Sequence, residues 1–260
     1  MTKASKILLP AVITLCSVMI GLACVADTAY PPASSSGSGP VSSGNNNAVV
    51  PEETPEQQVE RFFARWNFYI VGDWSGSMND NECAGSYGTR GDGEKVALTR
   101  FVREVIPQDA SRALYAFDDN GSFERVPLGL GNTEAVVREI DKVEAGQGTP
   151  LNSAIKHGVK ALSEQRERQG GAGYYYLIVA TDGEATDSGL DPYTGKRVAE
   201  DPLVRDGIKD ANEKNIILVT IGYCLQQGHP LKEHSFSYRE ASSPEELFEA
   251  LKEVQGELPY

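Results

Sequence analysis

Apolar runs of strand length alternate with segments of helical periodicity from about residue 60 onward, and this alternation most constrains the fold. The apolar runs are residues 66–72 (WNFYIVG), 113–117, 174–180 (YYYLIVA) and 216–223. Helical spacing of apolar residues is found over residues 94–106, 132–144, 151–164 and 201–213. Strands that alternate with helices favour a parallel sheet covered on both faces. We therefore expect an α/β fold with a doubly wound, mostly parallel sheet.

Local signals add detail to this outline. Asn120-Gly121 lies between the run at 113–117 and a short strand at 123–126, which indicates one antiparallel hairpin at the edge of the sheet. Asn132 and Ser242 each precede a helical segment and are expected to act as N-caps. Residues 236–241 are expected to form a short edge strand.

The first residues have the pattern of an export signal. Lys3 and Lys6 give a basic start, and residues 7–23 are mostly apolar. The run ends in Gly21-Leu22-Ala23-Cys24, which resembles a bacterial lipobox with glycine where leucine is usual, and Cys24 would then be lipidated. Two alternatives are cleavage after Ala26 with full secretion, and an uncleaved membrane anchor. We expect residues 1–23 to be a signal peptide.

The composition changes after Cys24. Residues 24–58 are rich in serine, glycine, proline and asparagine and offer little to bury, which predicts a disordered tether. The folded domain is expected to span residues 59–260. A lipid, a flexible spacer and a globular head together predict an exported protein of the cell envelope, periplasmic or on the cell surface, with secretion as the alternative.

The charge balance disfavours nucleic acids and anionic membranes as partners. Aspartate and glutamate number 37 against 24 lysines and arginines, for a formal charge of −13. Loss of residues 1–23 removes two lysines and no acid, which takes the charge to −15. Nucleic acids and anionic membranes require basic residues to meet their phosphates. We therefore expect no nucleic-acid partner, and membrane contact only through the lipid anchor.

Oxygen-bearing side chains gather where the predicted strands end. Asp73, Ser75 and Ser77 follow the first strand, Asp182 follows the strand at 174–180, and Thr149 precedes the helix at 151–164. In doubly wound sheets, ligands bind beyond the carboxyl ends of the strands. Three hydroxyls and two carboxylates are hard donors that exclude a typical zinc site and suit Mg²⁺ or Mn²⁺, with a position open to an outside oxygen. Taken singly, each motif is also compatible with a turn or a helix N-cap.

Together these residues resemble the metal-ion-dependent adhesion site of von Willebrand factor type A domains. The likeness rests on Asp73-Trp74-Ser75-Gly76-Ser77, on Thr149 and on Thr181-Asp182-Gly183, and it extends over residues 66–258. The resemblance implies a doubly wound sheet, a bound Mg²⁺ or Mn²⁺, and ligand binding without catalysis. It also implies a protein partner, which we expect to contribute an aspartate or glutamate carboxylate to the metal.

Two other functions remain open from the sequence. One is a Mg²⁺-dependent phosphohydrolase that uses Asp73, although the Asp-x-Asp spacing and a phosphate-binding lysine are lacking. The other is a structural module whose metal site is unused. Residues 88–95 nearly match a phosphate loop, but Glu94 replaces the required lysine, which favours a surface loop. Arg90-Gly91-Asp92 matches an integrin-binding motif that is frequent by chance.

Further expectations concern the surroundings of the site. Cys83 and Cys224 both follow strands at one sheet edge, and we hypothesise that they form a disulfide, which an exported compartment permits. Trp74 is either a packing residue or part of the partner contact. The long segments 185–200 and 224–235 leave the same edge of the sheet, either as the partner-selective surface or as ordinary insertions.

Overall fold

The computed structural model describes residues 54, 55, 57, 65–183, 205–225, 230–233 and 235–256, all within the compact unit Pro51–Tyr260. Its sheet has six strands in the order β3-β2-β1-β4-β5-β6. Neighbouring strands are parallel except β2 and β3. The strands are β1 (Trp66–Asp73), β2 (Ser111–Asp118), β3 (Gly121–Gly129), β4 (Tyr174–Thr181), β5 (Ile217–Tyr223) and β6 (Ser237–Ala241). The mostly parallel sheet with one antiparallel hairpin is thus confirmed.

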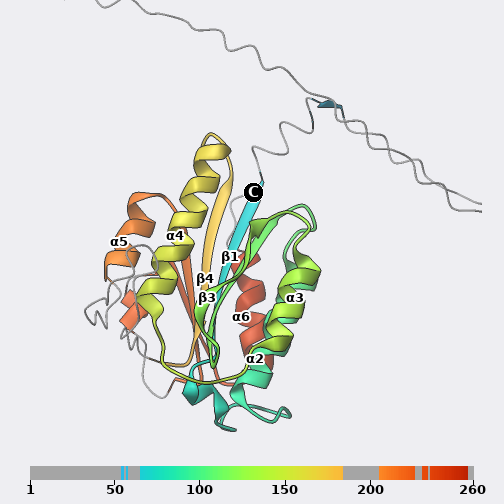
Figure 1. Ribbon diagram of the computed structural model, residues 1–260, viewed down its shortest axis with the longest axis vertical. Helices are drawn as coiled ribbons and strands as arrows, with labels where there is room; N and C mark the ends of the chain where they lie inside the picture. The colour runs from blue at the N-terminus through green and yellow to red at the C-terminus, as the bar shows by residue number, and fades with distance from the viewer. Residues whose placement is uncertain are drawn as a thin grey trace, which may run out of the picture. The chain divides into compact units, whose positions relative to one another are not determined.

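Helices cover both faces of the sheet (Figure 1). One face carries α2 (Arg90–Arg100), which continues as a π-helical turn (Phe101–Val105), together with α3 (Thr133–Lys142) and α6 (Pro244–Gly256). The other face carries α4 (Leu151–Arg168) and α5 (Arg205–Glu213). Short 3₁₀ turns occupy Gly76–Asn79 and Pro230–Glu233. None of the described helices combines the length and apolar character needed to cross a membrane.

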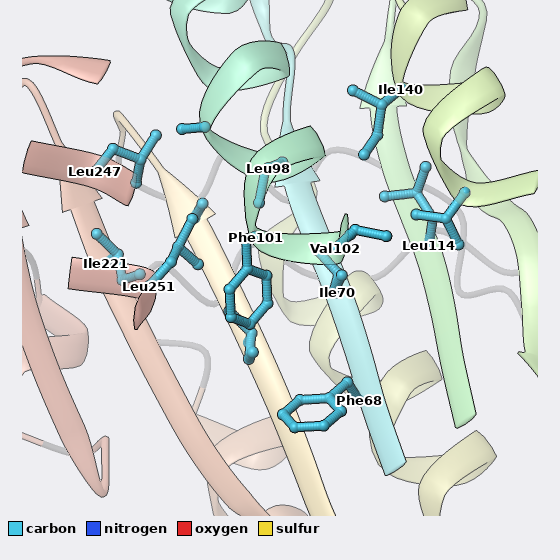
Figure 2. Close-up of a cluster of buried hydrophobic side chains, with 14 of the residues drawn as sticks. Phe68, Ile70, Leu98, Phe101, Val102, Leu114, Ile140, Ile221, Leu247 and Leu251 are labelled. Carbon is cyan, nitrogen blue, oxygen red and sulfur yellow. The ribbon is translucent and has the colours of Figure 1, made fainter. Parts of the chain in front are cut away.

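The apolar runs are continuous because both faces of each central strand are buried. Alternate side chains of a strand point to opposite faces. Phe68 and Ile70 of β1 therefore pack under α2 and α6, as Figure 2 shows. Tyr69 and Val71 face α4 instead. Two apolar layers thus hold the central strands rigidly, and the loops at the strand ends are built on that frame.

Helix α2 begins four residues earlier than the helical periodicity indicated. Thr89 is its N-cap: the Thr89 hydroxyl accepts a hydrogen bond from the backbone N–H of Asp92 at 3.1 Å, and the Asp92 carboxylate accepts one from the Thr89 N–H at 3.2 Å. This reciprocal capping box satisfies two amides that the helix leaves unpaired. The interpretation of residues 88–95 as a surface loop is therefore wrong, and Glu94 lies inside the helix.

Of the two predicted N-caps, one is confirmed in position and one is corrected. Asn132 is the N-cap residue of α3, but its side chain makes no cap hydrogen bond and instead donates to the carbonyls of Arg112 at 3.1 Å and Pro127 at 2.7 Å, so it joins α3 to the β2–β3 hairpin. At α6, the cap is Ser243, whose hydroxyl accepts from the Glu246 N–H at 3.2 Å. The Glu246 carboxylate accepts from the Ser242 N–H at 2.8 Å.

The direction of the strand order reverses at the centre of the sheet. From β1 the chain adds β2 and β3 on one side, then returns to place β4, β5 and β6 on the other. The carboxyl ends of β1 and β4 therefore flank the point where a doubly wound sheet opens a crevice. Asp73 is the last residue of β1, and Thr181 is the last residue of β4.

Candidate metal centre

Asp73 is held in place at the end of β1 and is completely buried. One carboxylate oxygen, Oδ1, accepts a hydrogen bond from the Ser75 N–H at 2.9 Å, which forms a tight turn out of the strand. The other, Oδ2, accepts from the Thr181 hydroxyl at 2.6 Å. The Asp73 side chain thus connects the ends of β1 and β4.

Ser75, Ser77 and Asp182 form a continuous chain of hydrogen bonds beside Asp73. The Ser75 and Ser77 hydroxyls lie 3.1 Å apart, and the Ser77 hydroxyl donates to Asp182 Oδ1 at 2.7 Å. Ser75 and Asp182 are buried, whereas Ser77 is exposed. The group of oxygens therefore has one side open to solvent, where an outside ligand can approach.

Thr149 reaches the same place from the loop before α4. Backbone hydrogen bonds fasten that loop to the loop after β1: Gly146 N–H donates to the Trp74 carbonyl at 2.9 Å, and Gly76 N–H donates to the Gln147 carbonyl at 3.0 Å. The Thr149 hydroxyl oxygen lies 3.9 Å from the position that a Cβ would take on Gly183. All five residues singled out from the sequence therefore meet at the β1–β4 switch point.

Trp74 packs inside the protein and is fully buried. Its indole N–H donates to the Gly91 carbonyl at 3.3 Å, which links the loop after β1 to the first turn of α2. Of the two readings offered by the sequence, packing is confirmed, because a fully buried ring has no surface to offer a partner.

Sequence reasoning missed Glu94, a third carboxylate at the site. Glu94 is only 1 % exposed, and its Oε1 accepts a hydrogen bond from the Asp73 N–H at 3.4 Å. Its Oε2 has no hydrogen-bond partner. The helical spacing over residues 94–106 puts Glu94 in a helix, and the Thr89–Asp92 pair is the local signal that this helix begins earlier, at Arg90.

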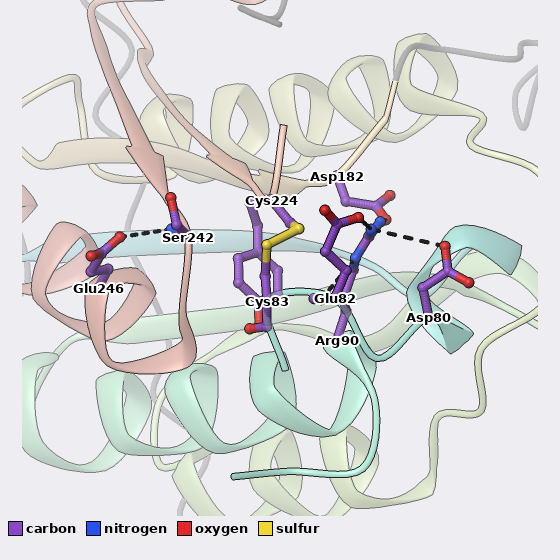
Figure 3. Close-up of a disulfide and its surroundings, with 9 residues drawn as sticks. Asp80, Glu82, Cys83, Arg90, Asp182, Cys224, Ser242 and Glu246 are labelled. Carbon is purple, nitrogen blue, oxygen red and sulfur yellow. Dashed lines mark hydrogen bonds and ion pairs between the residues drawn. A yellow bond between two sulfur atoms is a disulfide. The ribbon is translucent and has the colours of Figure 1, made fainter. Parts of the chain in front are cut away.

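Sequence reasoning also missed Arg90. Its side chain is buried, with Nη1 3.0 Å from Asp182 Oδ2 and Nη2 2.9 Å from Glu82 Oε2, and Figure 3 shows it lying between these acids. The Arg90 Nε–H also donates to the Glu82 carbonyl at 3.1 Å. Arg90 and Gly91 are both buried, so the Arg-Gly-Asp sequence is not presented to an integrin-like partner.

The site carries more negative than positive charge. Burial, and secondly the charge of Asp182, raises the pKa of Asp73 to about 7. Burial, followed by the charges of Asp73 and Asp182, also raises the pKa of Glu94 well above its usual range. Buried carboxylates in mutual repulsion bind a cation favourably, because it relieves both the repulsion and the loss of water.

The donor set fits a small hard cation. Among the residues that the structure describes, no three His, Cys, Asp or Glu side chains are grouped as a metal-binding cluster. A cation here therefore depends on the hydroxyls of Ser75, Ser77 and Thr149 as well as on carboxylates. Oxygen donors of this kind suit Mg²⁺ or Mn²⁺.

A disulfide lies next to the site. Cys83, in the loop after β1, is bonded to Cys224, directly after β5, with the two Cα atoms 5.8 Å apart (Figure 3). The Tyr223 hydroxyl donates to the Cys83 carbonyl at 2.9 Å beside it. The loop that carries Asp80, Glu82 and Cys83 is thus tied to the second half of the sheet.

Three other predictions lie outside the described residues. They are the signal peptide, most of the tether including Cys24, the start of the domain at residue 59, and the loop at 185–200. Within the segment 224–235, residues 226–229 and 234 also lie outside the described residues.

Comparisons with known proteins agree with this architecture. The family model described as von Willebrand factor type A domain matches residues 67–255. No curated protein matches the sequence. Three solved structures with a similar fold are the vWF domain of the type V pili tip protein Mfa5 from Porphyromonas gingivalis, the pilus adhesin SpaC from Lactobacillus rhamnosus GG, and an aerotolerance-related membrane protein from Bacteroides fragilis.

These similarities are structural. Each of the three is 14 % identical to the chain, and the TM-scores are 0.56, 0.55 and 0.54 in the same order. The alignments cover 74 %, 74 % and 73 % of this chain. They cover 94 % of the Mfa5 domain, 30 % of SpaC and 96 % of the Bacteroides protein. The chain therefore spans less than a third of the SpaC adhesin.

Proposed function

The chain belongs to the von Willebrand factor type A domain family, and on this basis we propose that it is a metal-dependent protein-binding module. The observation that carries the proposal is the meeting of three hydroxyls and two carboxylates at the β1–β4 switch point. Ser75, Ser77 and Thr149 would bind Mg²⁺ or Mn²⁺ directly. Asp73 and Asp182 would supply negative charge and orient water molecules around the cation.

The partner would approach from the solvent side of Ser77. A dication bound mainly by hydroxyls prefers a hard anionic donor at its open position, so we propose an aspartate or glutamate of another protein. The acidic surface of the chain does not prevent this, because charges more than about 8 Å away are largely screened at physiological ionic strength. The names of the pilus adhesin and the pilus tip protein, whose folds are similar, are in keeping with a role in adhesion or assembly.

Catalysis by Asp73 is disfavoured by the geometry of the site. A phosphohydrolase nucleophile needs a free carboxylate oxygen facing the substrate. Both oxygens of Asp73 already accept hydrogen bonds, from the Ser75 N–H and the Thr181 hydroxyl, and the side chain is completely buried. We propose a binding module without enzymatic activity.

Display outside the cytoplasm is part of the same proposal. A lipid on Cys24 and a flexible tether would hold the domain at a membrane surface of the cell envelope. Mass spectrometry of the membrane-extracted protein should find an acylated Cys24 at the N-terminus, and two or more acyl chains would give stable anchoring. An unmodified N-terminus at Asp27 would show that the protein is secreted.

A pull-down with and without a chelator tests the binding function. The full chain, immobilised and incubated with envelope extract, should retain a partner in Mg²⁺ or Mn²⁺ and release it in EDTA. Thr149→Ala should lose the partner while remaining folded. The matched control is Ser163→Ala, which removes a hydroxyl that donates to the Val159 carbonyl within α4, several turns after Thr149, and which should bind normally. Retention of the partner in EDTA would mean that recognition lies elsewhere.

A further inference from the structure

A buried guanidinium lies inside the proposed metal site. We propose that Arg90 is a fixed internal counter-ion of the site, whose positive charge stabilises the cation-free state and weakens the binding of a divalent cation. This inference rests on the proposed metal-binding function and concerns how strongly the site holds its cation. It assigns the affinity of the site to a residue that is not itself a metal ligand.

Arg90 is hydrogen-bonded to one of the two carboxylate oxygens of Asp182, a residue of the proposed metal site. Asp182 accepts from the Ser77 hydroxyl at Oδ1 and from Arg90 Nη1 at Oδ2, at 2.7 and 3.0 Å. The guanidinium therefore neutralises the same carboxylate that is expected to supply charge to the cation. A charge-assisted hydrogen bond of this kind is stronger than a neutral one, especially when it is buried.

The excess of negative charge in the site gives the positive charge of Arg90 a stabilising role. Asp73, Glu94 and Asp182 interact electrostatically with one another, and all three side chains are buried. Without a positive group, three neighbouring carboxylates would destabilise the folded, cation-free protein. The buried Arg90 guanidinium, 3.0 Å from Asp182, offsets part of this repulsion when no cation is bound.

The same charge must then act against the cation. A guanidinium and a dication that share one carboxylate repel each other, and the repulsion is weakly screened because the Arg90 side chain is 9 % exposed. Removal of the arginine charge should therefore strengthen cation binding, by about tenfold or more for charges this close at an effective dielectric constant of roughly 20.

The surrounding loop also contacts Arg90. Its backbone N–H donates to the Asp80 carbonyl at 2.8 Å, and its Nη2 lies 2.9 Å from the carboxylate of Glu82. Glu82 directly precedes Cys83, which the disulfide ties to Cys224 at the end of β5 (Figure 3). The Arg90 guanidinium thus contacts Asp182 within the site and Glu82 in the disulfide-linked loop outside it.

Calorimetric titration of Mn²⁺ and Mg²⁺ into the full chain, purified in detergent, tests this role. Arg90→Gln should bind Mn²⁺ at least about tenfold more tightly than the parent chain. It should also melt at a lower temperature in EDTA and gain more in melting temperature from Mn²⁺. Arg90→Lys keeps the charge and should bind Mn²⁺ within about threefold of the parent. Arg103→Gln removes the same charge from an exposed pair with Glu134 and serves as the control, with no change expected.

Each outcome decides the question. Unchanged or weaker Mn²⁺ binding by Arg90→Gln would overturn the proposal and make Arg90 a positioning residue for Asp182. If Arg90→Gln does not fold, Arg90→Lys decides alone: a large change in its affinity would show that the forked hydrogen bonds matter, and not the charge. Absence of metal binding by the parent chain would instead contradict the proposed function.

Discussion

Asp73 connects the fold to the chemistry of the site. It ends β1, bridges to β4 through Thr181, and carries a carboxyl whose pKa is raised to about 7, first by burial and then by Asp182. In the unfolded chain the same carboxyl titrates near its ordinary pKa of 3.8. In the cation-free protein, the folded state therefore binds a proton more strongly than the unfolded state does.

The stability of the cation-free protein should consequently fall as the pH rises. Between pH 4 and pH 7 the folded state retains a proton that the unfolded state has lost, so each step upward favours unfolding, and the loss is complete above the folded pKa of about 7. Thermal unfolding in EDTA from pH 5 to 8 should show this decline for the parent chain.

The matched control for this decline is Asp73→Asn. The amide that this substitution introduces retains an oxygen for the Ser75 N–H and a group that can pair with the Thr181 hydroxyl, but it has no charge to bury. The melting temperature of the variant should therefore fall less than that of the parent over the same pH range. Parallel curves for the two proteins would mean that Asp73 does not titrate as described.

Gly72 shows how closely the frame is packed around the site. A Cβ on Gly72 would lie 2.6 Å from the Cη2 atom of the fully buried Trp74 ring. Gly72→Ala should therefore destabilise the protein by about 1–3 kcal/mol, as overpacked cores generally do. Urea unfolding measures the change, and the variant Trp74→Phe in the Gly72→Ala background should recover part of it. A neutral Gly72→Ala would show that the ring can shift at little cost.

The site residues differ in how predictable they were. Asp73, Ser75, Ser77, Thr149 and Asp182 were found from the sequence because each directly follows a strand or precedes a helix, and these positions follow from the order of elements alone. Arg90 and Glu94 were missed because their contribution depends on which face of α2 is turned toward the strand ends. That orientation is fixed by the tertiary packing of Trp74 against Gly91, which no local pattern reveals.

At the scale of elements, strands were more predictable than helix ends. Continuous apolar runs reflect burial on both faces, so the strands were placed within a few residues of their observed positions. The exception is β3, which continues along the edge through Pro127 to Gly129, two residue types that the sequence pattern does not assign to a strand. Helix starts depend on single side chains. Asn132 is the N-cap residue of α3 as predicted, but its amide donates to the carbonyls of Arg112 and Pro127 and not to its own helix.

The disulfide is the covalent link between the two halves of the sheet at the site. It joins Cys83 and Cys224, which are 141 residues apart in the sequence. A double Cys83→Ser, Cys224→Ser variant should lose about 2–5 kcal/mol of stability, since the bond restricts the unfolded chain. Denaturant unfolding of oxidised and reduced parent protein and of the variant measures this. An equal stability of the three would show that the noncovalent packing of the loop is sufficient.

At the scale of the whole molecule, the described residues of the sheet and its helices form one von Willebrand factor type A domain, with the proposed site at one edge of the sheet. The family was recognisable from the sequence because four oxygen donors follow strands and a fifth precedes a helix, in the order that the family shows, and the family model matches most of the predicted domain. The conformation of the proposed partner-selective loops could not be predicted in the same way. Loops that connect the strands and helices have no hydrophobic pattern that determines their conformation.

The direct test of the account is the titration of Mn²⁺ and Mg²⁺ into the full chain, compared with Asp73→Asn. We predict one cation per chain in the parent, with Mn²⁺ raising its melting temperature, and no binding in Asp73→Asn, which keeps the fold but lacks the central charge. Binding by Asp73→Asn as tight as that of the parent, or no binding by the folded parent, would contradict the assignment of a metal centre to the ends of β1 and β4.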